Sequence, residues 1–124
     1  MKEIGKTVWA IPEGYIPSQS VSQERELLSH ETACILNANS KDANVKLTVF
    51  FANRDPVSYR VSVPAHRTLH LRFNDLRYPQ PVPEGTEYSS LFVSDVPIVV
   101  QHTRLDSRRA ENALMTTIAS PARD

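Results

Sequence analysis

The sequence predicts an all-β protein: a single-domain antiparallel β-sandwich of seven to eight short strands, with a barrel as the alternative. Short segments that alternate between apolar and polar residues recur along the chain, as expected for strands with one buried face. The 9 prolines fall largely between these segments, where they end strands and prevent long helices. A length of 124 residues suits one hydrophobic core and leaves no room for two.

The first predicted strand covers residues 7–11, with Trp9 at its centre. Pro12 and Gly14 are expected to end it, because proline lacks an amide hydrogen and glycine permits unusual dihedral angles. Residues 17–29 are mostly polar and are predicted to form a long surface loop.

Residues 30–38 and 44–51 are predicted to form the next two strands, joined by a polar turn. The second of these strands shows the clearest alternation, with Val45, Leu47 and Val49 on one face. That face is expected to point into the core.

Residues 57–62 and 68–73 are predicted to pair as a hairpin. Opposite residues in a hairpin point the same way, so pairing Val61 with Leu69 keeps both apolar faces inward. The same register gathers three basic side chains on the outer face of the hairpin: Arg60, His70 and Arg72.

Residues 74–85 carry three prolines and are predicted to form an extended crossover loop before a strand at 88–93. The β-branched run Ile98, Val99 and Val100 then predicts a strand that is covered on both sides. Polar groups follow this run at once: Gln101, His102, Thr103, Arg104, Asp106, Arg108 and Arg109. They could form a binding site held by a rigid strand, or a solvated turn in which arginine and aspartate pair.

Residues 111–118 could form a short helix or a last strand, and the β-branched Thr116, Thr117 and Ile118 favour the strand. The β-sandwich domain is therefore predicted to span residues 1–119. A disordered tail is expected at 120–124.

The composition describes an ordinary globular protein, with 40% hydrophobic and 23% charged residues. The 14 basic residues balance the 14 acidic ones, so no overall field attracts nucleic acid or anionic lipid. Cys34 is the only cysteine, which excludes an intramolecular disulfide and favours a reducing compartment. The N-terminus lacks the apolar core of a signal peptide, so a cytoplasmic location is expected.

Catalytic and metal-binding patterns are weak. His66 and His70 have the spacing of a zinc pair on a helix, but four strand residues span about 13 Å. Ser107, His102 and Asp106 supply the residue types of a catalytic triad, yet no nucleophile-elbow motif precedes the serine. The sequence therefore predicts no enzyme activity, no metal and no cofactor.

Ligand binding is better supported. The candidate ligand-binding residues combine aromatic, acidic and basic groups near predicted strand ends, as sugar sites do: Trp9, Glu13, Tyr15, His102 and Arg104. For Trp9, packing in the core is the alternative. Arg67 falls on the inward face of its predicted strand, so either the strand has a bulge there or Arg67 pairs with a buried acid, for which Glu31 is a possible partner.

DNA binding is a weaker alternative. It would use a basic patch made of Arg60, His70, Arg72, Arg108 and Arg109. Such binding would fall steeply with salt concentration.

Several motifs together resemble the sensory rhodopsin transducer family. They are Trp9-Ala10-Ile11 with Glu13-Gly14-Tyr15-Ile16-Pro17, Ser29-His30-Glu31-Thr32 with Cys34-Ile35-Leu36-Asn37, Val63-Pro64-Ala65-His66-Arg67-Thr68, Arg72-Phe73-Asn74-Asp75-Leu76, and the run from Val96 to Arg108 followed by Ala110-Glu111-Asn112-Ala113-Leu114. The last block is the most specific, and residues 17–29 and the tail depart from the family pattern.

The resemblance implies a β-sandwich protomer in a cyclic homotetramer. It also implies a signalling adaptor that docks on the cytoplasmic face of a microbial rhodopsin and relays a light signal. A similarity to carbohydrate-binding β-sandwiches and a DNA-binding regulatory role are implied as alternatives. A fold carries over between relatives more safely than a function does.

Overall fold

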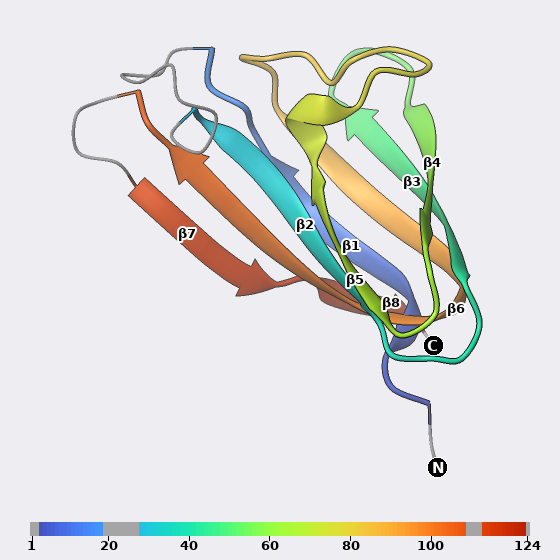
Figure 1. Cartoon of the computed structure of the whole chain (residues 1–124). Coiled ribbons are helices and arrows are strands. Elements are labelled where there is room, and N and C mark those ends of the chain that lie inside the picture. The colour runs from blue at the N-terminus through green and yellow to red at the C-terminus, as the bar shows by residue number, and fades with distance from the viewer. Residues whose placement is uncertain (1–2, 19–27, 109–112, 124) are drawn as a thin grey trace.

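The computed structural model describes residues 3–18, 28–108 and 113–123, which form an antiparallel β-sandwich and confirm the predicted fold class (Figure 1). The elements in chain order are β1 (Lys6–Gly14), β2 (His30–Asn37), β3 (Ala43–Phe51), β4 (Val57–Val63), β5 (Arg67–Arg72), the 3-10 turn η2 (Phe73–Asp75), β6 (Tyr88–Asp106), β7 (Ala113–Ile118) and β8 (Ser120–Arg123). The predicted surface loop at 17–29 lies mostly outside the described residues.

Strand β6 belongs to both sheets. Its residues 88–98 pair with β1 and β3 in the sheet β4-β3-β6-β1-β8, and residues 99–106 pair with β2 and β7 in the sheet β5-β2-β6-β7. The sequence predicted two strands here. Pro97 does not interrupt the strand because it lies between the last β3 partner, Ser94, and the first β2 partner, Val99. Few ladder hydrogen bonds are needed there, and proline is tolerated at such places.

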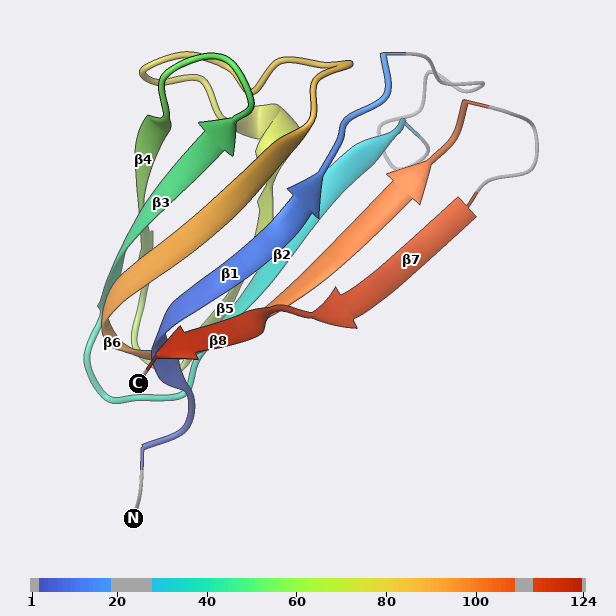
Figure 2. The same ribbon diagram turned by 180° about the vertical axis from the view of Figure 1, so that it is seen from behind.

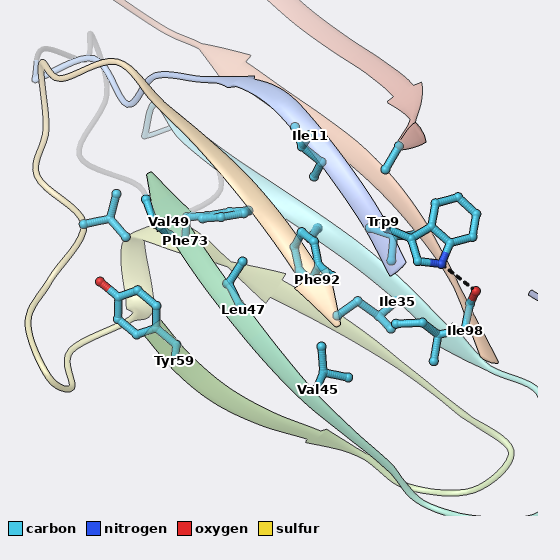
Figure 3. Close-up of a cluster of buried hydrophobic side chains, with 14 of the residues drawn as sticks. Trp9, Ile11, Ile35, Val45, Leu47, Val49, Tyr59, Phe73, Phe92 and Ile98 are labelled. Atoms are coloured by element: carbon cyan, nitrogen blue, oxygen red, sulfur yellow. Dashed lines mark hydrogen bonds between the residues drawn. The ribbon is translucent and has the colours of Figure 1, made fainter. Parts of the chain in front are cut away.

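The core lies between the two sheets, where the inward faces of the strands meet (Figure 3). Phe73 lies edge-on to Phe92, with ring centroids 6.4 Å apart. The buried apolar side chains of the strands surround this pair: Trp9, Ile11, Ala33, Ile35, Val45, Leu47, Val49, Val57, Tyr59, Ile98 and Val100.

The predicted hairpin of residues 57–62 with 68–73 is wrong. β4 pairs with β3, and β5 pairs with β2 in the other sheet, so residues 64–66 cross from one sheet to the other. Two strands in facing sheets also turn their apolar residues toward each other, so alternation alone does not distinguish crossing from pairing. As a result Arg60 lies apart from His70 and Arg72, and the predicted basic patch is divided between two sheets.

Both ends of the chain contribute more strand than the sequence predicted. β1 continues through Pro12 to Gly14, with a register shift after Ile11 that accommodates the proline. Residues Ser120–Arg123, predicted as part of a disordered tail, form β8 and pair with β1 as Figure 2 shows. This pairing satisfies backbone groups that β1 would otherwise expose at the sheet edge. The strand predicted within residues 111–118 is confirmed as β7 over 113–118, and residues 111–112 lie outside the described ranges.

Candidate functional site

A buried carboxylate lies at the centre of the candidate site. Glu31 is on β2, and strand alternation places it on the same inward face as Ala33 and Ile35. Its side chain is 1% exposed. A carboxylate buried in this way is stable only when other groups compensate its charge and fill its hydrogen-bonding positions.

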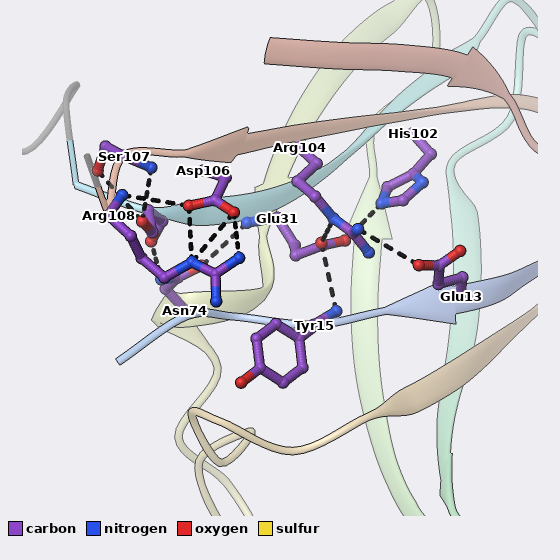
Figure 4. A network of polar contacts seen from close by, with 10 residues as sticks. Glu13, Tyr15, Glu31, Asn74, His102, Arg104, Asp106, Ser107 and Arg108 are labelled. Carbon is purple, nitrogen blue, oxygen red and sulfur yellow. Dashed lines mark hydrogen bonds and ion pairs between the residues drawn. The ribbon is translucent and has the colours of Figure 1, made fainter. Parts of the chain in front are cut away.

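Three groups compensate Glu31 (Figure 4). His102 Nε2 lies 2.5 Å from Glu31 Oε1, and Arg104 donates from Nε to Oε2. The backbone amide of Tyr15 donates to the same oxygen at 3.3 Å. Both side chains come from the inward face of β6, whose register sets Arg104 directly opposite Glu31.

Arg104 extends the network toward solvent. Its Nη1 donates to Glu13 Oε1 over 3.4 Å, and the Glu13 side chain is 80% exposed. Burial by itself lowers the pKa of the Arg104 guanidinium, but the hydrogen bond and charge of Glu31, with a smaller effect of Glu13, raise this pKa above its ordinary value. Arg104 is therefore a fixed cation.

Tyr88, the first residue of β6, lies opposite Gly14 of β1 and beside Glu31 and Arg104. A Cβ atom on Gly14 would lie 2.2 Å from Tyr88 Cε1, so the ring uses the space that only glycine leaves open. The Tyr88 hydroxyl is buried and makes no hydrogen bond to the part of the chain that the structure describes. Burial raises the pKa of this hydroxyl well above its ordinary value, and the negative charge of Glu31 adds to the shift.

Two cavities adjoin the network. The larger, about 990 Å³, opens where β1 and β3 end and β6 begins, and its lining includes Glu13, Tyr15 and Arg104. The smaller, about 300 Å³, lies between β1 and β7 and is lined in part by Glu13, His102 and Arg104. The charged network therefore forms a wall shared by both cavities.

A second cluster of hydrogen bonds fixes the end of β6 beside the charged network. Ser29 Oγ accepts a hydrogen bond from the Ser107 amide at 2.9 Å, and Asn74 Nδ2 donates to the Ser29 carbonyl at 3.1 Å. Arg108 donates to both oxygens of Asp106, so this arginine and aspartate do pair, as in the solvated-turn alternative. The hydrogen bond of Arg108 lowers the pKa of the Asp106 carboxyl.

The structure brings together four of the five predicted ligand-binding residues: Glu13, Tyr15, His102 and Arg104. Trp9 is not with them. It is 5% exposed, its Nε1 donates to the Ile98 carbonyl at 2.9 Å, and it lines neither of these two cavities. Trp9 is thus a core residue, which is the alternative that the sequence left open.

The sequence interpretation missed Glu31 and Tyr88 as site residues. Glu31 pairs with Arg104 and His102 rather than with Arg67, which is exposed and donates to the His66 carbonyl. The available signal was a carboxylate in phase with Ala33 and Ile35 on a buried face. Of the predicted basic patch, Arg108 is exposed and Arg109 lies outside the described residues.

Within the described ranges, no group of three or more His, Cys, Asp and Glu side chains could hold a metal ion. The same part of the chain contains no helix with the length and apolar character needed to cross a membrane.

Comparison with known proteins gives a consistent result. Residues 4–121 match the family model described as "Anabaena sensory rhodopsin transducer". A solved structure named Anabaena sensory rhodopsin transducer is 55% identical, with 88% of this chain and 96% of that chain covered and a TM-score of 0.77. The crystal structure of Thermotoga maritima 1070 is 35% identical, with 94% of each chain covered and a TM-score of 0.84. No functionally curated protein matches at a significant level.

Proposed function

The chain belongs to the Anabaena sensory rhodopsin transducer family, and from this membership we propose that it is a non-enzymatic signalling adaptor that binds a membrane receptor at the cytoplasmic face. The observation that carries the proposal is the 55% identity, over 88% of the chain, to a protein named as a rhodopsin transducer. The proposed receptor is a microbial rhodopsin or a similar membrane sensor.

The proposed working form is a homotetramer. An outward face of the sheet β5-β2-β6-β7 supports assembly, because it exposes Leu36, Leu114 and Ile118 by 43%, 68% and 59%. The register places all three on this face, since Leu36 pairs with Val99 and Ile118 pairs with Gln101. Large exposed apolar side chains on one face are typical of an interface between subunits.

The test uses Anabaena sensory rhodopsin reconstituted in lipid nanodiscs. We expect saturable binding of this chain to the rhodopsin discs, none to empty discs, and a changed photocycle rate on binding. Light scattering after size exclusion should give four times the chain mass of 14.0 kDa. Absence of binding at tens of micromolar protein, together with an unchanged photocycle, would contradict the adaptor role.

Small-molecule binding, with sugars as the expected class, is the second candidate. The cavity lined by Glu13, Tyr15 and Arg104 supports it, while the burial of Trp9 removes the expected stacking platform. A thermal-shift screen with mono- and disaccharides tests it, because a ligand at 100 times its dissociation constant stabilises a protein by about 2.7 kcal/mol. A shift that Tyr15→Ala abolishes would favour this function. The DNA alternative has less support, because its basic patch is divided between two sheets.

A further inference from the structure

The larger cavity has both acidic and aromatic side chains in its lining. Acidic and aromatic side chains from three strand ends meet there: Glu13, Tyr15, Phe50, Phe51, Glu87 and Tyr88. These residues come from the end of β1, the end of β3 and the start of β6, so a rigid sheet holds the opening.

Two carboxylates, Glu13 and Glu87, line the opening. Among the described residues of the lining Arg104 is the cation, and buried Glu31 already balances it through the Nε hydrogen bond. Glu13 keeps only the 3.4 Å contact to Arg104, and Glu87 makes no ion pair with another described residue. Two exposed carboxylates therefore remain for a positive group to approach.

The aromatic rings of the opening favour cations. The Arg108 guanidinium lies 6.0 Å from the Tyr15 ring centroid, and the Arg54 guanidinium lies 5.2 Å from that of Phe51. Phe50 is 41% exposed, and no cation of the described residues lies over its ring. A cation placed over an aromatic face gains electrostatic attraction, and a guanidinium also stacks on the ring.

Tyr88 adds a buried polar side chain to the lining of this cavity. Its side chain is 5% exposed and lines the cavity, and its hydroxyl has no hydrogen-bond partner among the described residues. A neutral phenol can accept a hydrogen bond from an ammonium or guanidinium N–H. A buried polar atom without a partner is uncommon and calls for an explanation.

We propose that this cavity receives a lysine or arginine side chain from the cytoplasmic segment of the partner receptor. The proposal rests on the adaptor function and specifies the chemistry of its contact. Cytoplasmic loops of membrane proteins carry an excess of lysine and arginine, which complements an opening that offers two carboxylates and the exposed ring of Phe50.

The first experiment measures fluorescence anisotropy of a labelled, amidated peptide in which glycine alternates with arginine and lysine. A peptide with glutamine in place of the basic residues is the negative control. We expect Glu13→Gln combined with Glu87→Gln to weaken binding about tenfold, since each exposed ion pair contributes up to about fivefold. Tyr88→Phe should weaken it about two- to threefold by removing one acceptor.

Glu84→Gln is the matched control, because Glu84 is exposed, is close in sequence to Glu87 and does not line the cavity. It should bind the peptide as the unmodified protein does. Equal binding by the double glutamine variant and the unmodified protein would overturn the proposal. Free acetyl-arginine amide that binds as tightly as the peptide would also overturn it, because the site would then serve a small molecule.

The rhodopsin nanodiscs separate this proposal from the adaptor function. Discs that bind the unmodified protein and the double glutamine variant equally would overturn the cavity assignment and leave the adaptor role standing. If the double glutamine variant loses binding to the discs while the unmodified protein and Glu84→Gln keep it, both the cavity assignment and the adaptor role are supported. Peptide binding that depends on the two carboxylates, without any binding to discs, would support the basic-side-chain site and overturn the adaptor role.

Discussion

The two ends of β2 bury polar side chains equally well but use them differently. Glu31 is 1% exposed and Asn37 is 0% exposed, and both point inward from the same strand. Asn37 is neutral: its Nδ2 donates to the carbonyls of Lys41 and Val63 at 2.8 and 2.9 Å, and its Oδ1 accepts from the Asn39 amide at 3.0 Å. Asn37 therefore connects the turn at Lys41 to the end of β4 at Val63.

The end of β2 at Glu31 is charged, and its ion-pair network borders two cavities. Glu31 is compensated by side chains, and one of them, Arg104, lines both openings. Burial alone therefore does not distinguish a structural polar residue from one that serves a site. The distinction lies in whether the partners are backbone carbonyls of the fold or side chains that also face a cavity.

Removing Glu31 should have the largest effect on stability. Glu31→Ala leaves the Arg104 guanidinium partly buried without its main partner, and breaking such a pair lowers the free energy of unfolding by about 3 kcal/mol. Urea unfolding at a fixed protein concentration measures this value. Adding Arg104→Leu should restore part of the loss, because the unpaired charge is then gone. A fully additive double variant would show that the two side chains are not coupled.

Asn37→Ala should destabilise the protein by about 2 kcal/mol, because two backbone carbonyls and one amide lose their buried partner. The same urea experiment measures it. This variant should bind partners normally once folded, since Asn37 lines neither cavity of the site. Altered binding by a folded Asn37→Ala protein would contradict the division between the two ends.

Tyr88→Phe should change the free energy of unfolding little at pH 7 and measurably at alkaline pH. The folded state holds the pKa of Tyr88 above its ordinary value of 10.0, so this group contributes stability below pH 10 that is lost as the pH rises further. At pH 11 the unmodified protein should lose about 1.4 kcal/mol more than Tyr88→Phe. Parallel pH profiles of the two proteins would show that the hydroxyl is not protected by burial.

Glu13→Gln should have the smallest effect. An exposed ion pair at 3.4 Å contributes at most a few tenths of a kcal/mol, so stability should change by less than about 0.5 kcal/mol in low salt. Thermal unfolding in 50 mM and 500 mM sodium chloride checks this. A loss above 1 kcal/mol would mean that Glu13 belongs to the buried network rather than to the opening.

The sequence predicted the strands better than their partners. Alternation identified the inward faces, because burial acts on each strand locally. It did not show that residues 64–66 cross between sheets, since facing sheets give the same pattern as a hairpin. It also missed β8, because Pro121 has low β-propensity and is tolerated only by an edge strand.

The candidate site was predicted only in part, because the local pattern of a strand does not show which strand lies beside it. Glu13, His102 and Arg104 were recognised as polar groups near strand ends, and the fold does bring them together. Glu31 was missed because its importance depends on which β6 residues lie opposite it, and its partner Arg104 is 73 residues away in the sequence.

The continuity of β6 has a consequence for how the protein unfolds. A strand that supplies the middle of both sheets cannot leave one sheet while the other stays intact, so the two sheets form one cooperative unit. Amide hydrogens of Phe92 in one sheet and Val100 in the other should therefore exchange with deuterium at the rate of global unfolding. Strand β8, with a partner on one side only, should exchange earlier through local fraying.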